Sequence, residues 1–158
     1  IAEYISGDVD SFAALMNQEA AAMGATRSHF VNPNGLPDEN HYTCVYDMYL
    51  IFSNAIKNDT FVSIIGTTSY DVTYTDASGE AVTHTWENTN QYLTGNATTP
   101  DGFQIVGGKT GTTGEAGYCL VLYSYNPSGQ PIISIVFKAD GKSNLYLLMN
   151  EMLQGFAI

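Results

Sequence analysis

The residues with the clearest chemical potential lie together at positions 107–113, which read Gly-Gly-Lys-Thr-Gly-Thr-Thr. Lys109 supplies an ammonium group, which attracts a substrate carboxylate or supports proton transfer. The hydroxyl of Thr110 can hydrogen-bond the same carboxylate, and Gly111 lets an acyl group approach the backbone closely. The backbone N–H of Thr112 can stabilise a developing oxyanion. On the edge of a sheet, these residues would form one wall of a cleft suited to acyl transfer.

A phosphate-binding loop is the alternative chemistry for this glycine-rich segment. Such a loop needs a glycine, four further residues and then Gly-Lys-Ser/Thr. Gly102 and Gly107 have the right gap, but Gly108 follows and Lys109 comes one position late. A phosphate loop must also open a helix, whereas a β-rich run follows here. The segment is therefore interpreted as part of a strand. A surface strand that ends in a glycine-rich turn, without chemistry, is the structural alternative.

The composition limits the partners of the chain. Its 158 residues suffice for one domain, and a hydrophobic content of 44% with 13% charged residues is typical of a globular protein. The formal net charge of -11 would repel nucleic acid and anionic lipid, so neither is expected as a partner. The sequence shows no signal peptide and no apolar run of the roughly 18 residues that span a membrane.

The hydrophobic pattern predicts helices first. The first residues, Ile1 to Ile5, resemble the last turns of a helix, so we expect an upstream part to be missing. Apolar residues at helical spacing predict further helices at 11–23, 44–57 and 60–65. Thr43 and Thr60 are the expected N-caps of the last two.

The pattern then changes to strands. Alternation predicts a hairpin of 69–75 with 81–86, a strand at 103–109 and a second hairpin of 117–125 with 131–138, whose strands are apolar enough to be covered on both faces. A final helix at 144–156 would cover the sheet with Leu145, Leu148, Met149, Met152 and Leu153. The fold class is therefore α+β. We expect a single incomplete domain, with a helical part at 1–66 and the sheet and last helix at 67–158.

Several phrases outside the glycine-rich segment point to a known family. They are Met16-Asn17 with Ala20 and Met23-Gly24, Thr26 through Phe30, Asn32-Pro33-Asn34-Gly35-Leu36, His41-Tyr42-Thr43, Tyr46-Asp47-Met48, Asn88-Thr89-Asn90-Gln91-Tyr92-Leu93 and Ala116-Gly117-Tyr118-Cys119-Leu120. With Gly108 to Thr113 they resemble, in order and over nearly the whole chain, the D-alanyl-D-alanine carboxypeptidases, which are low-molecular-mass penicillin-binding proteins. Lys-Thr-Gly is one of the motifs of penicillin-interacting serine enzymes. The resemblance implies part of a β-lactamase/DD-peptidase-like fold.

The resemblance also implies a function and roles for residues. It implies a serine enzyme that cleaves, or transfers to, the terminal D-Ala-D-Ala of peptidoglycan stem peptides through an acyl-enzyme. It further implies covalent inhibition by β-lactam antibiotics, a cell-wall-facing, extracytoplasmic location, and no metal or organic cofactor. Lys109, Thr110 and Gly111 match the third motif of the family. Lys109 and Thr112 would be catalytic, the latter completing the oxyanion hole, and Thr110, Gly111 and Thr113 would bind substrate.

The family's nucleophile, the serine of Ser-x-x-Lys, is absent from this sequence. No lysine has a serine three positions before it; Ser53 and Ser134 each precede a lysine by four. The second motif, Ser-x-Asn, occurs only as Ser124-Tyr125-Asn126, after Lys-Thr-Gly instead of before it, and is interpreted as chance. Ser6-Gly7-Asp8 fits a corner between two helices. Both upstream motifs are therefore expected to precede Ile1.

The missing motif leaves other functions open. The chain alone is expected to be catalytically inactive. It could instead be a nucleophile-free relative that binds peptidoglycan or another wall protein, or part of a β-lactamase, which shares Lys-Thr-Gly. If strands are missing, an exposed sheet edge predicts self-association or pairing with the missing N-terminal segment.

The remaining histidines, aromatic residues and cysteines are assigned structural roles. His29 and His41 are expected to make structural hydrogen bonds, and His84 to be solvated. Trp86, the single tryptophan, is expected in the core or packed on the hairpin, rather than stacked on a substrate. The eleven tyrosines could indicate carbohydrate binding, but most occupy positions where an amphipathic ring packs well. Cys44 and Cys119 lie in apolar runs and are interpreted as free thiols, although they could pair.

Overall fold

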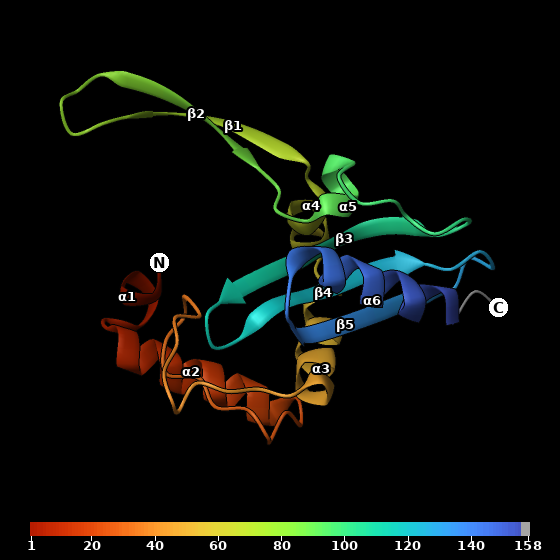
Figure 1. Ribbon diagram of the computed structural model, residues 1–158. Helices are drawn as coiled ribbons and strands as arrows, with labels where there is room; N and C mark the ends of the chain where they lie inside the picture. Colours follow the sequence, from red (N-terminus) through yellow and green to blue (C-terminus); the bar gives the residue numbers. More distant parts are fainter. Residues whose placement is uncertain (156–158) are drawn as a thin grey trace.

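The chain places its elements in the predicted order, helices first and an antiparallel sheet afterwards (Figure 1). The computed structural model describes residues 1–155. Its helices are α1 (Ala2–Ser6), α2 (Val9–Ala22), α3 (Val45–Ala55), α4 (Asp59–Gly66), α5 (Gln91–Thr94) and α6 (Lys142–Gly155). Its strands are β1 (Ser69–Thr75), β2 (Ala81–Glu87), β3 (Gln104–Thr113), β4 (Gly117–Tyr125) and β5 (Pro131–Ala139). The predicted α+β class is confirmed.

The antiparallel sheet has the order β3-β4-β5, and helices cover both of its faces. Leu120 and Leu122 of β4 are completely buried and pack with Met149 of α6. Val121 points to the other face, where it packs with Phe52 of α3. Because successive side chains of a strand point to opposite faces, the apolar run of β4 serves two cores, as predicted. Each such side chain contributes about 1.5–3 kcal/mol when it is fully buried.

Helix α4 approaches strand β3 backbone to backbone, and this contact requires glycine on both sides. A Cβ atom on Gly107 would lie 2.6 Å from the carbonyl oxygen of Ile65, and one on Gly66 would lie 2.6 Å from that of Val106. The register of β3 against β4 also shifts between Ile105 and Gly107. Gly107 therefore lets β3 pack closely against α4, whereas a Cβ atom on Gly108 would meet the carbonyl oxygen of Val121 on β4.

Both predicted N-caps of the helical part are wrong by one or two residues. Helix α3 has Cys44 as its N-cap residue and no side-chain cap, because the hydroxyl of Thr43 lies 2.7 Å from that of Ser28 instead. Helix α4 begins after Asn58, whose Oδ1 accepts from the amide of Thr60 at 2.9 Å. Asparagine and threonine are both good N-cap residues, so the sequence around Asn58 and Thr60 did not show which of them caps α4.

The final helix begins two residues earlier than predicted, at Lys142, and the predicted end at Phe156 lies outside the described residues. The prediction for Leu148 is wrong, since this side chain is 40% exposed. Tyr146 is buried instead, and its hydroxyl accepts a hydrogen bond from the amide of Gln91 at 2.8 Å. No helix within residues 1–155 is long and apolar enough to cross a membrane.

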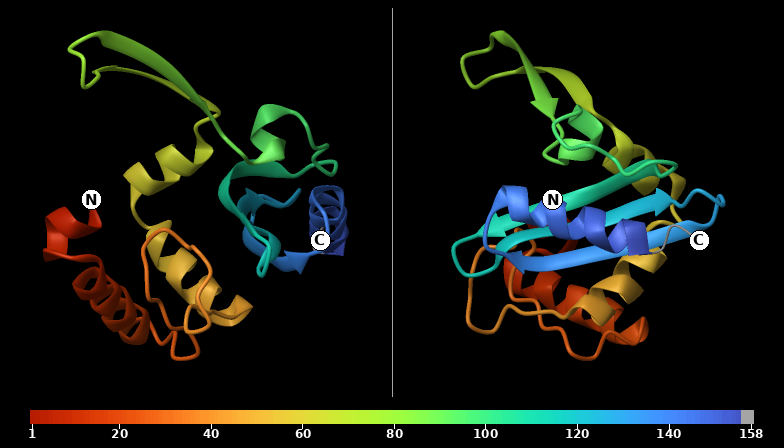
Figure 2. Two further views of the ribbon diagram at one scale, coloured as in Figure 1. Left: turned by 60° about the vertical axis from the view of Figure 1, so that its left-hand side comes forward. Right: turned by 45° about the vertical axis from the view of Figure 1, so that its right-hand side comes forward.

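Strands β1 and β2 form a separate two-stranded hairpin that projects from the rest of the chain (Figures 1 and 2). Its turn places Gly79 at a φ of 88°, a conformation that favours glycine. Of the two predicted positions of Trp86, the core is wrong, since the side chain is 57% exposed, and packing on the hairpin is confirmed, since its ring contacts that of His84 with centroids 5.9 Å apart. His84 itself is exposed, as predicted.

The corner between the first two helices forms at Ser6-Gly7-Asp8, as predicted. Gly7 has a φ of 88° and ends α1. Asp8 caps α2, because its carboxylate accepts from the amide of Ser11 at 2.6 Å. The carboxylate also accepts from the hydroxyl of Ser11, and these hydrogen bonds lower the pKa of Asp8. Ser6-Gly7-Asp8 therefore forms a structural turn between α1 and α2.

The two cysteines are both free thiols, in agreement with the interpretation from the sequence. Cys44 precedes α3, whereas Cys119 lies on β4 opposite Gly111. The Sγ atom of Cys119 donates to the carbonyl oxygen of Ala116 at 3.3 Å. Each thiol is only partly buried.

Candidate active site

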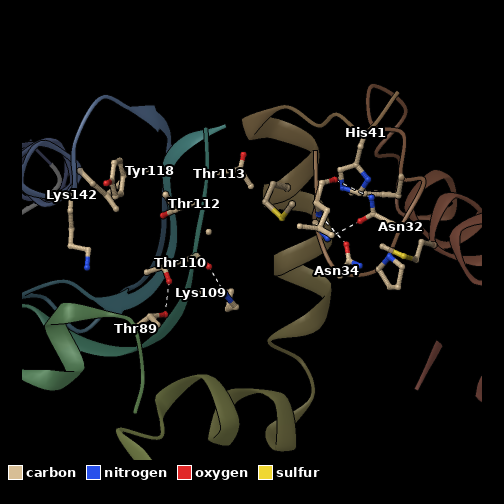
Figure 3. A pocket seen from close by; sticks show the side chains of 18 of the residues that line it. Asn32, Asn34, His41, Thr89, Lys109, Thr110, Thr112, Thr113, Tyr118 and Lys142 are labelled. Atoms are coloured by element: carbon tan, nitrogen blue, oxygen red, sulfur yellow. Dashed lines mark hydrogen bonds between the residues drawn. The ribbon is translucent and has the colours of Figure 1, made fainter. Parts of the chain in front are cut away.

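A cleft of about 800 Å³ separates the edge of the sheet from the helical part of the chain (Figure 3). Residues 109–113 of β3 form one wall. The other wall comes from α2, α3 and the loop between them. The residues that line this second wall are Met16, Phe30, Asn32, Pro33, Asn34, Gly35, Leu36, His41 and Met48. All five site residues that the sequence predicts therefore lie along one cleft.

In the strand wall, which is residues 109–113 of β3, the side chains point alternately to two sides of the sheet edge. Figure 3 shows Lys109 and Thr113 on the side of the loop, and Thr110 and Thr112 on the side of Tyr118. This division follows from the alternation of side chains along a strand. No strand within residues 1–155 pairs with the outer edge of β3, so its outward backbone groups are free to pair with an extended ligand.

Lys109 and Thr110 are fixed by local hydrogen bonds. The Nζ of Lys109 is exposed and donates to the carbonyl oxygen of Thr110. The hydroxyl of Thr110 lies 2.5 Å from that of Thr89, which precedes α5 and also lines the cleft. The ammonium of Lys109 and the hydroxyl of Thr110 thus lie at the cleft surface on opposite sides of the strand edge, and each is a group that can donate to a carboxylate oxygen.

Gly111, Thr112 and Thr113 differ in what surrounds them. A Cβ atom on Gly111 would meet no other atom within 4 Å, so open space lies before this residue. Thr112 is exposed in the cleft. The hydroxyl of Thr113 accepts from the amide of Ala116 at 3.0 Å and so belongs to the turn between β3 and β4. Its side chain is therefore partly committed to structure.

The second wall of the cleft, or loop wall, is held in place by hydrogen bonds of side-chain amides. Asn17 of α2 donates to the carbonyl oxygen of Phe30 at 2.7 Å and accepts from the amide of Phe30 at 2.8 Å. Asn32 accepts from the amide of Gly35 and donates to the carbonyl oxygen of Leu36, at 2.8 and 3.0 Å. Gly35 has a φ of 77°, which favours glycine. The Asn-Pro-Asn-Gly-Leu phrase is therefore a preformed turn at the cleft rim.

Asp47 anchors the same loop to α3. It is buried, and its Oδ2 accepts from the amide of Arg27 at 2.7 Å and from the hydroxyl of Ser28 at 2.8 Å. Removal from water acts to raise the pKa of Asp47, but these hydrogen bonds outweigh it and hold the pKa below its usual value. The carboxylate therefore stays ionised and positions the loop that faces β3.

The two histidines of this loop make the structural hydrogen bonds that the sequence predicts. His29 Nδ1 lies 2.6 Å from the carbonyl oxygen of Asn40, and the backbones of His29 and Tyr42 pair as an isolated bridge. The Nδ1 of His41 accepts from the amide of Val31 at 3.2 Å, so its proton lies on Nε2. His41 also lines the cleft.

Several residues that line the cleft were not predicted as part of a site. Lys142, at the start of α6, brings a second ammonium group to the cleft, and Tyr118 and Thr89 line it as well (Figure 3). Lys142 follows the sheet by three residues and has no local motif. Only the folding of α6 across the sheet brings it near β3, so a single sequence holds no signal for it.

No serine or cysteine of residues 1–155 lines the cleft. Ser124, of the Ser-Tyr-Asn phrase, is completely buried on β4. Asn126 lies in the turn before β5, where its carboxamide accepts from the amide of Gln130 at 2.8 Å. This phrase therefore lies away from the cleft, in agreement with its interpretation as chance.

Comparison with known proteins supports the resemblance. The family described as D-alanyl-D-alanine carboxypeptidase (peptidase S11) matches residues 1–141. The D-alanyl-D-alanine carboxypeptidase DacF of Bacillus subtilis is 32% identical over 154 residues, which cover 97% of this chain and 36% of that protein. The D-alanyl-D-alanine carboxypeptidase of Streptomyces sp. strain K15 is 30% identical over 155 residues, which cover 95% of this chain and 50% of the relative. The chain thus spans about half or less of the length of these relatives.

Solved structures give the same result for the fold. The S216A mutant of the Streptomyces K15 DD-transpeptidase matches with a TM-score of 0.83 and 30% identity, over 95% of this chain and 56% of that one. The D-alanyl-D-alanine carboxypeptidase DacD of Francisella tularensis matches with a TM-score of 0.79 and 25% identity, over 97% and 46% of the two chains. The predicted likeness to part of a DD-peptidase fold is confirmed.

Proposed function

Because this chain belongs to the D-alanyl-D-alanine carboxypeptidase family, we propose that it forms part of a serine peptidase that acts on peptidoglycan stem peptides ending in D-Ala-D-Ala. The observation that carries this proposal is the position of residues 109–113. They lie along a sheet edge without a strand partner within residues 1–155, facing a cleft whose opposite rim is a preformed turn. An extended peptide end fits such an edge, because the strand offers it backbone hydrogen bonds.

Each residue of the strand wall has a proposed role. Lys109, assisted by the hydroxyl of Thr110, attracts the terminal carboxylate of the peptide and supports proton transfer. The open space before Gly111 admits the scissile carbonyl. The amide of Thr112 donates to the oxyanion when the carbonyl becomes tetrahedral. Thr113 supports this wall through the turn that it stabilises, and Lys142 adds positive charge to the cleft.

We propose that the nucleophile comes from a part of the polypeptide outside these 158 residues. The sequence has no Ser-x-x-Lys, and no serine of residues 1–155 lines the cleft. An oxyanion hole without a nucleophile forms no acyl-enzyme. The isolated chain is therefore expected to be inactive and to form no adduct with β-lactam antibiotics, whereas the complete enzyme would be inhibited by them. Action on wall peptides places the complete enzyme outside the cytoplasm, facing the wall.

A nucleophile-free binding protein is the second candidate, and the same missing motif favours it. In that case the cleft would hold a stem peptide, or a segment of another wall protein, without cleaving it. The two candidates make the same use of Lys109 and Thr110 but differ in whether a covalent intermediate forms.

The deciding experiment is intact-mass spectrometry after incubation with a penicillin. It is applied to this 158-residue chain and to a longer product of the same gene that includes it. An adduct on the longer product alone supports a penicillin-reactive serine enzyme in which this chain supplies one wall. Absence of an adduct on both contradicts the enzyme proposal and favours the binding protein. Turnover of a D-Ala-D-Ala peptide by the isolated chain, abolished by Lys109→Ala, would contradict the proposed origin of the nucleophile.

A further inference from the structure

The β1–β2 hairpin carries an aromatic face that no other element within residues 1–155 covers. Its register places Tyr70 opposite Trp86 and Tyr74 opposite Val82. Since residues two apart on a strand share a face, these side chains line one face of the ribbon. Tyr70, Tyr74 and Trp86 are 60%, 48% and 57% exposed. A row of exposed rings, unlike a single one, marks an interaction surface.

The aromatic face continues into a groove at the base of the hairpin. The groove has a volume of about 510 Å³ and is lined by Ile64, Thr67, Ser69, Tyr70, Trp86, Glu87 and Asn88. The residue after Asn88 is Thr89, whose hydroxyl contacts Thr110 in the cleft. A ligand that lies along the hairpin and enters the groove is therefore directed toward the candidate active site.

The chemistry of the hairpin restricts its partner. The opposite face is polar: the hydroxyls of Thr73 and Thr83 are 2.9 Å apart, and Thr85 donates to Asp71 at 2.6 Å. Residues 67–90 contain four carboxylates and no lysine or arginine. This charge repels anionic polymers and also a second copy of the same hairpin. An uncharged partner with both apolar faces and hydroxyl groups meets the pattern best.

Pyranose rings have this combination. Their C–H faces pack on the negatively charged face of an aromatic ring, and their hydroxyls can pair with the phenol groups of Tyr70 and Tyr74 and with the polar side chains of Ser69 and Glu87 that line the groove. The only aliphatic side chains on the aromatic face, Val72 and Val82, are half-buried, so the contacts that this face offers are its exposed rings, on which sugar rings stack. The surface is therefore better matched to a sugar polymer than to a protein.

We infer that the aromatic face docks the glycan strand of peptidoglycan, a chain of β-linked N-acetylhexosamine rings. The inference rests on the proposed function, because a stem peptide bound in the cleft brings with it the glycan to which it is attached. Stacking of successive rings on Trp86, Tyr70 and Tyr74 would hold the polymer while the peptide end reaches β3. The hairpin thereby distinguishes polymeric from short, soluble substrates.

The single tryptophan provides a direct test. The 158-residue chain is titrated with a β-linked N-acetylglucosamine hexamer while the fluorescence of Trp86 is recorded. Stacking should shift the emission in a saturable way. Tyr70→Ala should raise the Kd at least about fivefold, since an aromatic contact of this kind is worth about 1 kcal/mol. Tyr70→Phe should keep most of the affinity, and Thr73→Ala, on the polar face, should bind like the unchanged chain. Unchanged melting temperatures show that the variants are folded.

Three results would overturn the inference: no saturable change, a loss of affinity in Thr73→Ala equal to that in Tyr70→Ala, or binding by this chain but not by a longer gene product. The last result would mean that another part of the polypeptide covers the face.

The penicillin experiment remains independent of these outcomes. A longer product that forms the adduct yet does not bind the hexamer contradicts only the glycan surface. Binding of the hexamer without any adduct supports the surface and contradicts the serine enzyme.

Discussion

At the scale of single residues, Lys109 is the group on which the proposed chemistry depends most. Its ammonium is exposed in the cleft and makes only a local hydrogen bond to the next residue. We expect Lys109→Ala, made in the longer gene product, to slow acylation by a penicillin at least about 100-fold. Stability should change by less than about 0.5 kcal/mol, because the side chain is at the surface.

The matched control for this prediction is Lys57→Ala. Lys57 is also exposed but lies outside the cleft. The measurement is the rate of adduct formation by mass spectrometry, together with a thermal melt. Equal rates in the two variants would remove Lys109 from the mechanism.

Asp47 acts on the site indirectly, by holding the loop wall. Its pKa is lowered in the folded state by hydrogen bonds from Ser28 and Arg27, despite burial. The unfolded chain, with a pKa near 3.8, therefore binds the proton more readily, and the stabilisation by Asp47 is present above that value and lost as the pH falls through the folded pKa.

We therefore expect the melting temperatures of the unchanged chain and of Asp47→Asn to depend differently on pH. Between pH 5 and pH 3, the melting temperature of the unchanged chain should fall more steeply than that of Asp47→Asn, which cannot titrate. At pH 7 the variant should be less stable, since an amide replaces a carboxylate acceptor. Asp8 and Asp76 also have lowered pKa values, but they are present in both proteins and cancel in the comparison. Parallel curves would show that Asp47 is already protonated or unpaired.

The site residues could be predicted from the sequence where they are neighbours along the chain. Lys109, Thr110 and Gly111 stand next to one another on one strand, so their grouping needs no knowledge of the fold. Thr89 and Lys142 reach the same cleft only because the chain returns to β3 after the hairpin and α6 packs across the sheet. Such contacts depend on tertiary structure, and a single sequence does not encode them in any short pattern.

At the scale of elements, β3 contains one glycine that is needed for packing, Gly107, and one that leaves space for a ligand, Gly111. A Cβ atom on Gly107 would collide with the backbone of α4, whereas one on Gly111 would meet open space. We expect Gly107→Ala to lower the free energy of unfolding by about 1–3 kcal/mol, because backbone atoms must move. Gly111→Ala should change it by less than about 0.5 kcal/mol but should slow acylation of the longer product by obstructing the carbonyl.

Denaturant unfolding and adduct formation, measured on both variants, separate these tasks. The prediction requires that stability and reactivity respond to different glycines of one strand. A large loss of stability in Gly111→Ala would show that this residue, too, is needed for packing.

The same elements show where sequence patterns were sufficient. The period of apolar residues located every long helix and each hairpin, because burial on one face imposes that period. It did not place helix starts, since Asn58 and Thr60 are both good caps and the choice between them depends on contacts of the whole turn. It left Trp86 between a core position and packing on the hairpin, and the structure shows the latter, with the ring against His84.

At the scale of the whole molecule, the described chain leaves large apolar surfaces unpaired. Phe12, Leu15, Met23 and Ile51 line an apolar groove of about 540 Å³ between α2 and α3. The outer edges of β3 and β5 have no strand partner within residues 1–155. We propose, on this basis, that residues 1–66 and 67–158 are parts of one catalytic domain whose remaining elements would cover these surfaces. Unpaired edges and apolar grooves favour association with any available partner.

We therefore expect the isolated chain to self-associate, and its charge gives the prediction a distinctive form. The net charge of -11 opposes association of identical chains. Salt weakens that repulsion, since the screening length falls from about 30 Å at 0.01 M to about 10 Å at 0.1 M. The apolar attraction is not weakened by salt, so association should increase from low to moderate ionic strength. Size-exclusion chromatography with light scattering should show a mass above the 17.1 kDa of one chain, and more so at the higher salt concentration. A monomer at both salt concentrations would contradict the expectation, as would oligomers that dissociate when salt is added, because ion pairs rather than apolar surfaces would then hold the copies together.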